Sequence, residues 1–185
     1  VEGGKIDWAN HDNDAASALS ETIGFDEAVR RAYTFYEQHP DETLIVVTAD
    51  HETGGMRFAG ADSTRFLSVI PKQCNSFETI ERELKGKSWN ETREVLNRTL
   101  GFWDGITITP EEESMLKSLT GNAGETARYA KKLMNEKAGL TWSTGGHTND
   151  KVPVYAVGVG AERFSGEQDN TDIPKKLKQL MFPAR

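Results

Sequence analysis

The sequence predicts an α/β fold of three layers, in which helices cover both faces of a central sheet. Three observations lead to this class. Helical and strand patterns alternate in the first sixty residues, the run Thr43–Ala49 is β-branched and apolar, and a similar run returns at Val152–Val159 before a last amphipathic helix. A strand that is apolar on both faces is typical of a sheet buried between helices.

The first part of the chain supplies most of the predicted sheet elements. Residues 10–23 and 25–36 are predicted to be helices, and Pro40 follows the second one. Thr43–Ala49 is predicted to be a buried strand. Met56–Phe58 and Phe66–Ile70 are predicted to be shorter strands.

Residues 75–140 differ from this alternating pattern. Ser88 with Glu91, and Thr109-Pro110 with Glu112, are capping signals for the starts of helices. The stretch is polar and has no cluster of ligand-like residues, so we predict an inserted helical subdomain that acts as a lid or a partner surface. Val152–Val159 then returns to a strand pattern, and Asp172–Met181 is predicted to be the final helix.

Composition limits the classes of function. The chain has 185 residues, of which 36 % are hydrophobic and 28 % charged, and it has no apolar run near the ~20 residues needed to span a membrane. Its formal charge of −7 argues against nucleic-acid binding and would repel phosphate esters unless bound cations reversed the local field. Cys74 is the single cysteine, so no internal disulfide can form.

Three short segments, residues 2–11, 48–53 and 145–148, contain residue types that suit a metal site. Asp7 and His11 are four residues apart, so a helical turn places both on one face. Asp50 and His51 follow the predicted strand, where open α/β sheets bind their ligands. His147 follows two glycines. Neutral imidazoles and carboxylates are the usual protein ligands of catalytic zinc.

Each segment also has a structural explanation. Asp7 and His11 can form a surface pair, and Gly145-Gly146 can serve a turn with positive φ angles. Trp8 either lines a binding pocket or packs next to the first helix. Residues 12–14 either orient the His11 imidazole or cap the following helix.

In combination, the segments resemble the carboxyl-terminal part of the alkaline phosphatase family. Order, spacing and context agree for Glu-Gly-Gly-Lys-Ile-Asp-x-x-x-His, Val-Thr-Ala-Asp-His-Glu-Thr-Gly-Gly, and Gly-Gly-His-Thr followed by a strand and Asp-Asn-Thr-Asp. The resemblance is good over residues 1–60 and 141–182 and poor over the helical stretch. It implies a truncated fold of this family with a mostly parallel central sheet, so we expect residues 1–185 to form one α/β domain of a longer enzyme.

The resemblance also implies roles for six residues. Asp7, His11 and His147 would bind one zinc ion, Asp50 and His51 would bind a second, and Glu2 would bind a magnesium ion. In this family, two metal ions assist phosphoryl transfer through a phosphoserine. The family's serine nucleophile and phosphate-binding arginine lie upstream of these motifs. No Asp-Ser-Ala segment occurs here, so we expect the isolated chain to be inactive.

The expected partners follow from the same resemblance. They are phosphate monoesters and, because truncation would leave open strand edges, a second copy in a homodimer or a domain-swapped assembly. The resemblance implies a periplasmic or secreted location. Two alternatives remain open: another enzyme of the superfamily, such as a phosphomutase or phosphodiesterase, or a catalytically silent metal-binding or assembly fragment.

The metal assignment yields a first test, the substitution His147→Ala. It removes one ligand of the first zinc site, so we expect less zinc per protein molecule with the fold largely intact. Metal analysis together with circular dichroism measures both quantities. An unchanged zinc content would contradict the assignment.

Overall fold

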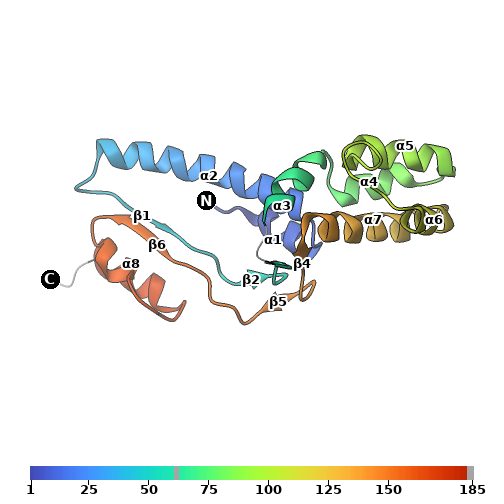
Figure 1. Ribbon diagram of the computed structural model, residues 1–185. Coiled ribbons are helices and arrows are strands. Elements are labelled where there is room, and N and C mark those ends of the chain that lie inside the picture. The colour runs from blue at the N-terminus through green and yellow to red at the C-terminus, as the bar shows by residue number, and fades with distance from the viewer. Residues whose placement is uncertain (61–62, 183–185) are drawn as a thin grey trace. The chain divides into compact units, whose positions relative to one another are not determined.

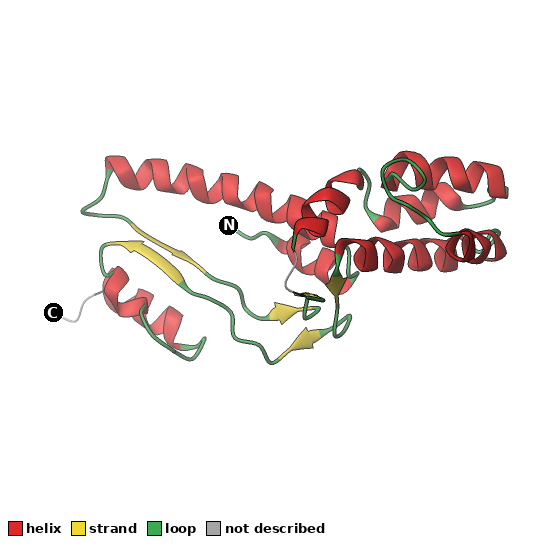
Figure 2. Ribbon diagram, in the orientation of Figure 1, coloured by secondary structure: helices red, strands yellow, loops and turns green. Residues whose placement is uncertain are grey.

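The computed structural model describes residues 1–60 and 63–182 (Figure 1). The chain divides into two compact units. Unit 1 comprises Val1–Glu2, Ile23–Glu52 and His147–Arg185, and unit 2 comprises Gly3–Thr22 and Thr53–Gly146. Figure 2 shows that helices dominate the described chain and that its strands are short. The candidate ligands are therefore divided between two units.

Unit 1 contains an antiparallel pair of strands. Strand β1 (Leu44–Val47) pairs with β6 (Tyr155–Gly158), and Ile45 lies opposite Val157. Gly158 has a φ of +105°, and a Cβ atom there would lie 2.1 Å from the Thr43 carbonyl oxygen. Only glycine therefore fits at this position. The unit also contains the 3₁₀ helix η2 (Ala161–Phe164), helix α8 (Asp172–Met181) and the larger part of helix α2 (Ala15–Gln38).

Unit 2 is mainly helical. Its strands β3 (Arg57–Phe58) and β4 (Leu140–Thr141) pair antiparallel. Strand β5 (His147–Thr148) belongs to unit 1, as does Glu52, the first residue of its partner strand β2 (Glu52–Thr53). The helices of unit 2, besides the start of α2, are α1 (Gly4–His11), α3 (Thr64–Val69), η1 (Ile70–Lys72), α4 (Phe77–Leu84), α5 (Trp89–Leu100), α6 (Pro110–Ser118) and α7 (Ala123–Ala138).

The core of unit 2 lies among α4, α5, α6 and α7. Its fully buried side chains repeat at helical spacing, and they include Ile80, Leu96, Leu100, Leu116, Leu133 and Met134. Burying one such side chain stabilises the fold by about 1.5–3 kcal/mol. Helix α7 is therefore held firmly along its buried face.

Both predicted capping boxes are present. The Glu91 carboxylate accepts a hydrogen bond from the Ser88 amide at 2.8 Å, and Thr109 and Glu112 make the reciprocal pair at the start of α6. Pro110 occupies the first turn of that helix, where no amide donor is needed. These helix starts are confirmed because capping depends on local chemistry.

Other elements differ from the prediction. The boundary between the first two helices differs from the predicted one at residue 24. Helix α1 ends at His11, and α2 runs without a break from Ala15 through Gly24 to Gln38. The predicted strand Phe66–Ile70 is wrong, because these residues lie in α3 and η1. Phe66 and Ile70 are four residues apart, so helical geometry turns both toward one small core while Leu67 is exposed.

The remaining strand predictions have mixed outcomes. The strand core of Thr43–Ala49 is confirmed as β1, but its four residues are half-buried and not buried as predicted. Asp172–Met181 forms α8 with the predicted bounds. The strand pairs with a described register are antiparallel. A mostly parallel central sheet therefore stays a prediction.

Among residues 1–60 and 63–182, no helix combines the length and the apolar character needed to cross a bilayer.

Glu112 and Lys137 generate a pH prediction for unit 2. Burial raises the pKa of the Glu112 carboxyl, but hydrogen bonds from Lys137 and the Thr109 amide, with the Lys137 charge, bring it below its ordinary value of 4.5. A group with a lowered folded-state pKa stabilises the fold above its ordinary pKa, and this stabilisation is lost as the pH falls through the folded-state pKa.

We therefore expect Glu112→Gln to lower the free energy of unfolding by about 1 kcal/mol at pH 7. The difference from the parent protein should shrink as the pH falls below 4.5, because the parent then loses the same charge. Urea unfolding at several pH values measures the difference. A difference in unfolding free energy between parent and variant that stayed constant down to about pH 2 would contradict a stabilising role of the Glu112 charge.

Candidate metal centre

Helix α1 presents Asp7 and His11 on one face, as their spacing predicts. The Asp7 Oδ1 and His11 Nε2 atoms are 3.4 Å apart, and both side chains are 37 % exposed. Two ligand atoms bound to one tetrahedral zinc ion at 2.0–2.1 Å lie about 3.3 Å from each other. The separation of this pair therefore fits a shared zinc ion.

A backbone carbonyl determines which nitrogen of His11 is available. The His11 Nδ1 atom lies 2.7 Å from the carbonyl oxygen of Gly145. A carbonyl oxygen only accepts hydrogen bonds, so Nδ1 carries the proton and donates it. In the neutral ring, Nε2 then has the lone pair that a metal requires, and this nitrogen faces Asp7.

The glycines before His147 allow a close approach of two chain segments. A Cβ atom on Gly145 would lie 3.2 Å from the His11 carbonyl oxygen. Neither Gly145 nor Gly146 has a φ in the positive region, so the explanation of a positive-φ turn is wrong. The Gly146 carbonyl oxygen accepts a hydrogen bond from the Gly54 amide at 2.8 Å.

Thr53 holds the Asp7 carboxylate. Its hydroxyl donates to Asp7 Oδ1 at 2.7 Å, and the residue is only 9 % exposed. Sequence reasoning assigned Thr53 no role, although it lies in the segment 48–53. Its position two residues after the candidate ligand His51 was the one sequence feature that could have indicated a role near the metal site. A buried hydroxyl bound to a ligand carboxylate is a typical way to orient that ligand.

In unit 1, Asp50 and His51 form a second pair with metal-compatible spacing. Asp50 Oδ2 and His51 Nε2 are 3.4 Å apart, the separation seen for Asp7 and His11. Asp50 Oδ1 also accepts a hydrogen bond from the His51 amide at 3.2 Å. The Asp50 side chain is 87 % exposed and that of His51 is 32 % exposed, so both are open to an ion.

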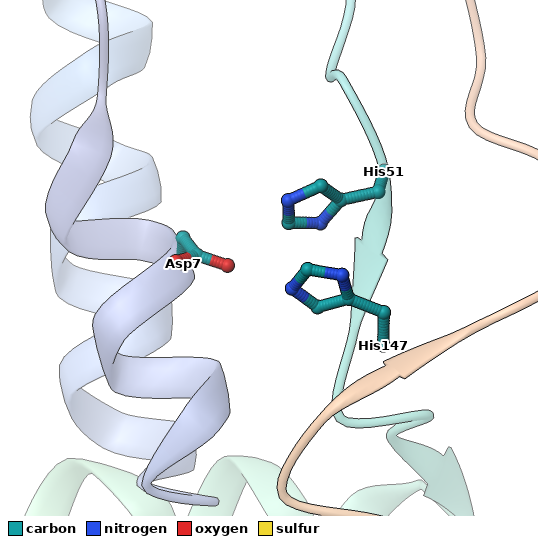
Figure 3. Close-up of side chains that lie close together, drawn as sticks. All are labelled: Asp7, His51 and His147. Atoms are coloured by element: carbon teal, nitrogen blue, oxygen red, sulfur yellow. The ribbon is translucent and has the colours of Figure 1, made fainter.

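The imidazole rings of His51 and His147 stack within unit 1. Their centroids are 3.6 Å apart with planes inclined by 23°, and each ring offers a nitrogen within 4.8 Å of the other's (Figure 3). Next to them, the Thr148 hydroxyl donates to Glu52 Oε2 at 2.6 Å. Figure 3 also draws Asp7 on α1.

Other residues singled out in the sequence have different surroundings. Glu2 is exposed on the segment before α1. Trp8 is 70 % exposed, so it is not packed against the helix. Asp14 accepts a hydrogen bond from the Ser17 amide and caps α2, as one of its two explanations predicted.

Unit 1 also contains a cavity beside the Asp50 pair. Its volume is about 550 Å³, and its lining includes four acidic residues, Asp50, Glu52, Asp150 and Glu167. Lys151 also lines it and pairs with Glu167 at 2.7 Å. The local charge is therefore suited to cations and unsuited to a free phosphate dianion.

Comparison with known proteins gives consistent results. Residues 1–182 match the protein family described as alkaline phosphatase. Alkaline phosphatase 3 of Bacillus subtilis is 34 % identical over 187 residues, which cover 98 % of this chain and 39 % of that protein. The repressible alkaline phosphatase of Saccharomyces cerevisiae is 30 % identical over 205 residues, which cover 98 % of this chain and 36 % of that protein.

A solved structure shares the fold. The cold-active alkaline phosphatase from the psychrophile Shewanella sp. superimposes with a TM-score of 0.85 at 34 % identity, over 98 % of this chain and 44 % of that one. The α/β fold is therefore like that of an alkaline phosphatase. The chain spans less than half the length of each of these three proteins.

Thr53→Val tests whether the Asp7 carboxylate is oriented for a metal. The substitution keeps the shape of the side chain and removes the donor, so we expect zinc affinity to fall by about 10- to 100-fold. Competition with a chromogenic chelator measures this affinity.

Thr99→Val is the matched control for that substitution. Thr99 is also buried, and its hydroxyl donates to the Val95 carbonyl oxygen within α5. We expect this control to leave zinc affinity unchanged. Equal affinities for both variants and the parent would exclude a role for Thr53 in metal binding.

Proposed function

Because the chain belongs to the alkaline phosphatase family, we propose that it is the carboxyl-terminal part of a metal-dependent phosphomonoesterase. The whole protein would hydrolyse phosphate monoesters through two zinc ions and a phosphoserine, with its serine nucleophile upstream of this chain. The observation that carries the proposal is the 3.4 Å pair of Asp7 and His11, with the second ring nitrogen of His11 bound to Gly145.

In this proposal the ligands form three groups. Asp7, His11 and His147 hold one zinc ion, Asp50 and His51 hold the second, and Glu2 binds a magnesium ion. Two hydrogen bonds support the Asp7–His11 part of this grouping: the Thr53 hydroxyl donates to Asp7, and His11 donates to the Gly145 carbonyl oxygen. Along the chain, His51 stands two residues before Thr53, and His147 two residues after Gly145.

The charges of these residues support a cation-dependent reaction. When bound, the metal ions supply positive charge that stabilises the attacking and leaving oxygens of phosphoryl transfer. The residues of the chain have different tasks. The Asp7 and Asp50 carboxylates offset the cationic charge, the neutral imidazoles bind without adding charge, and Thr53 and Gly145 hold the α1 pair in position.

Two further features belong to this proposal. A periplasmic or secreted location is proposed on family resemblance. A homodimer or domain-swapped assembly is proposed because β1 and β6 form a two-stranded sheet within the described chain, which leaves an outer edge on each strand. Cell fractionation tests the location, and sedimentation of the protein tests the assembly.

His11→Ala in the whole protein tests the function. It removes the ligand whose nitrogen faces Asp7, so we expect bound zinc to fall and kcat/KM for p-nitrophenyl phosphate to fall by roughly 1,000-fold or more. His39→Ala is the control, because His39 pairs with Glu42 at 3.1 Å after the end of α2. Loss of activity in both variants, or in neither, would contradict the proposal.

The same assays separate the rival functions. Faster hydrolysis of bis-p-nitrophenyl phosphate than of the monoester would favour a phosphodiesterase, and transfer of phosphate without release would favour a mutase. We expect the 185-residue chain alone to bind zinc without turnover. Full activity of that chain would mean that its nucleophile lies within these 185 residues.

A further inference from the structure

We propose that helices α4 and α7 position the metal-ligand helix α1 through the three residues that follow His11. All the groups involved lie in unit 2. The inference rests on the proposed function, because its consequence falls on the ligands Asp7 and His11. In this inference, the helices of residues 75–140 hold the metal-ligand helix in place, and Lys131 and Asn135 of α7 are the positioning residues.

The buried carboxylate of Asp14 is the first connection. Asp14 is 2 % exposed, and its carboxylate accepts hydrogen bonds from the amide and the hydroxyl of Ser17, in the first turn of α2. It also accepts one from the Gln73 side chain at 2.7 Å and one from the Phe77 amide at 2.9 Å. Phe77 is the first residue of α4. A single carboxylate therefore joins the end of the α1 segment to the starts of two other helices.

Helix α7 supplies the second and third connections. The Lys131 ammonium donates to the carbonyl oxygen of Asp12, and the Asn135 amide donates to that of Asn13 at 3.1 Å. Lys131 and Asn135 are four residues apart and therefore lie on one face of the helix. A cation on a carbonyl at the end of α1 also matches the partial negative charge of a helix carboxyl end.

Helix α1 needs external support because it is short. It has eight residues, and Ala9 is the one residue within it that is buried. An isolated helix of this length is marginal in water, and one buried methyl group adds little anchoring. Helix α7, in contrast, buries Ala130, Leu133 and Met134 in the core of unit 2. Hydrogen bonds to α7 therefore restrain α1, which has little buried surface of its own, by fixing it to a well-packed helix.

The position of the connections makes His11 sensitive to them. Asp12 follows His11 directly, and the amides of Asp12 and Asp14 donate to the Trp8 and Ala9 carbonyl oxygens inside α1. Asn13 has a φ of 53°, a left-handed conformation that costs energy unless its surroundings hold it. Release of residues 12–14 would loosen the last turn of α1, where the His11 imidazole begins.

Three variants of the whole protein test the inference. Lys131→Met keeps the side-chain stem and removes the donor, and Asn135→Ala removes the other donor while raising helix propensity. Lys132→Met is the matched control, because Lys132 is the exposed neighbour of Lys131 and pairs with Glu136 at 3.7 Å. Hydrogen exchange of the peptide containing residues 12–14 and the rate of zinc release to a chelator are measured for each variant.

We expect about 10-fold faster exchange and about 10-fold faster zinc release in Lys131→Met and Asn135→Ala, with parent values in Lys132→Met. Faster exchange without faster zinc release would overturn the inference, because the contacts would then be merely structural. Equal effects in all three variants would also overturn it, as would parent values in all three. His11→Ala distinguishes the two proposals: if it leaves zinc release at the parent value, the proposed function fails as well.

Discussion

Two hydrogen bonds of the same length hold the ligand-bearing helix α1. Thr53 donates to Asp7 and His11 donates to Gly145, each over 2.7 Å, and the partners come from segments 46 and 134 residues away along the chain. The bond to Gly145 also decides which ring nitrogen of His11 carries a proton, because a carbonyl oxygen accepts only from a protonated nitrogen. The geometry of the α1 pair thus depends on contacts that α1 cannot make by itself.

The acidic character of the protein is consistent with this arrangement. A chain with a formal charge of −7, and a cavity lined by four carboxylates, would repel a phosphate dianion. Cations held by carboxylates and neutral imidazoles would reverse that local field. In the proposed function, these carboxylates would concentrate divalent ions where the anionic substrate is bound.

Local chemistry explains where sequence reasoning about the fold succeeded. The capping boxes at Ser88 and Thr109 and the bounds of α8 depend on residues a few positions apart, and all three are confirmed. The predicted strand at Phe66–Ile70 was wrong because a short apolar run suits a strand or a helix equally. Burial of Phe66 and Ile70 against one small core selected the helix. The mostly parallel sheet was implied by resemblance and stays a prediction.

The sequence by itself determined the chemical types of the candidate ligands and the helical spacing of Asp7 and His11, since both are properties of residues and of local periodicity. It also carried the family membership, in the order of its three motifs. Only the tertiary structure decided the partners Thr53 and Gly145, the stacking of His51 on His147, and the task of Asp14. These contacts join residues tens of positions apart, and no local pattern records which distant segment folding brings alongside.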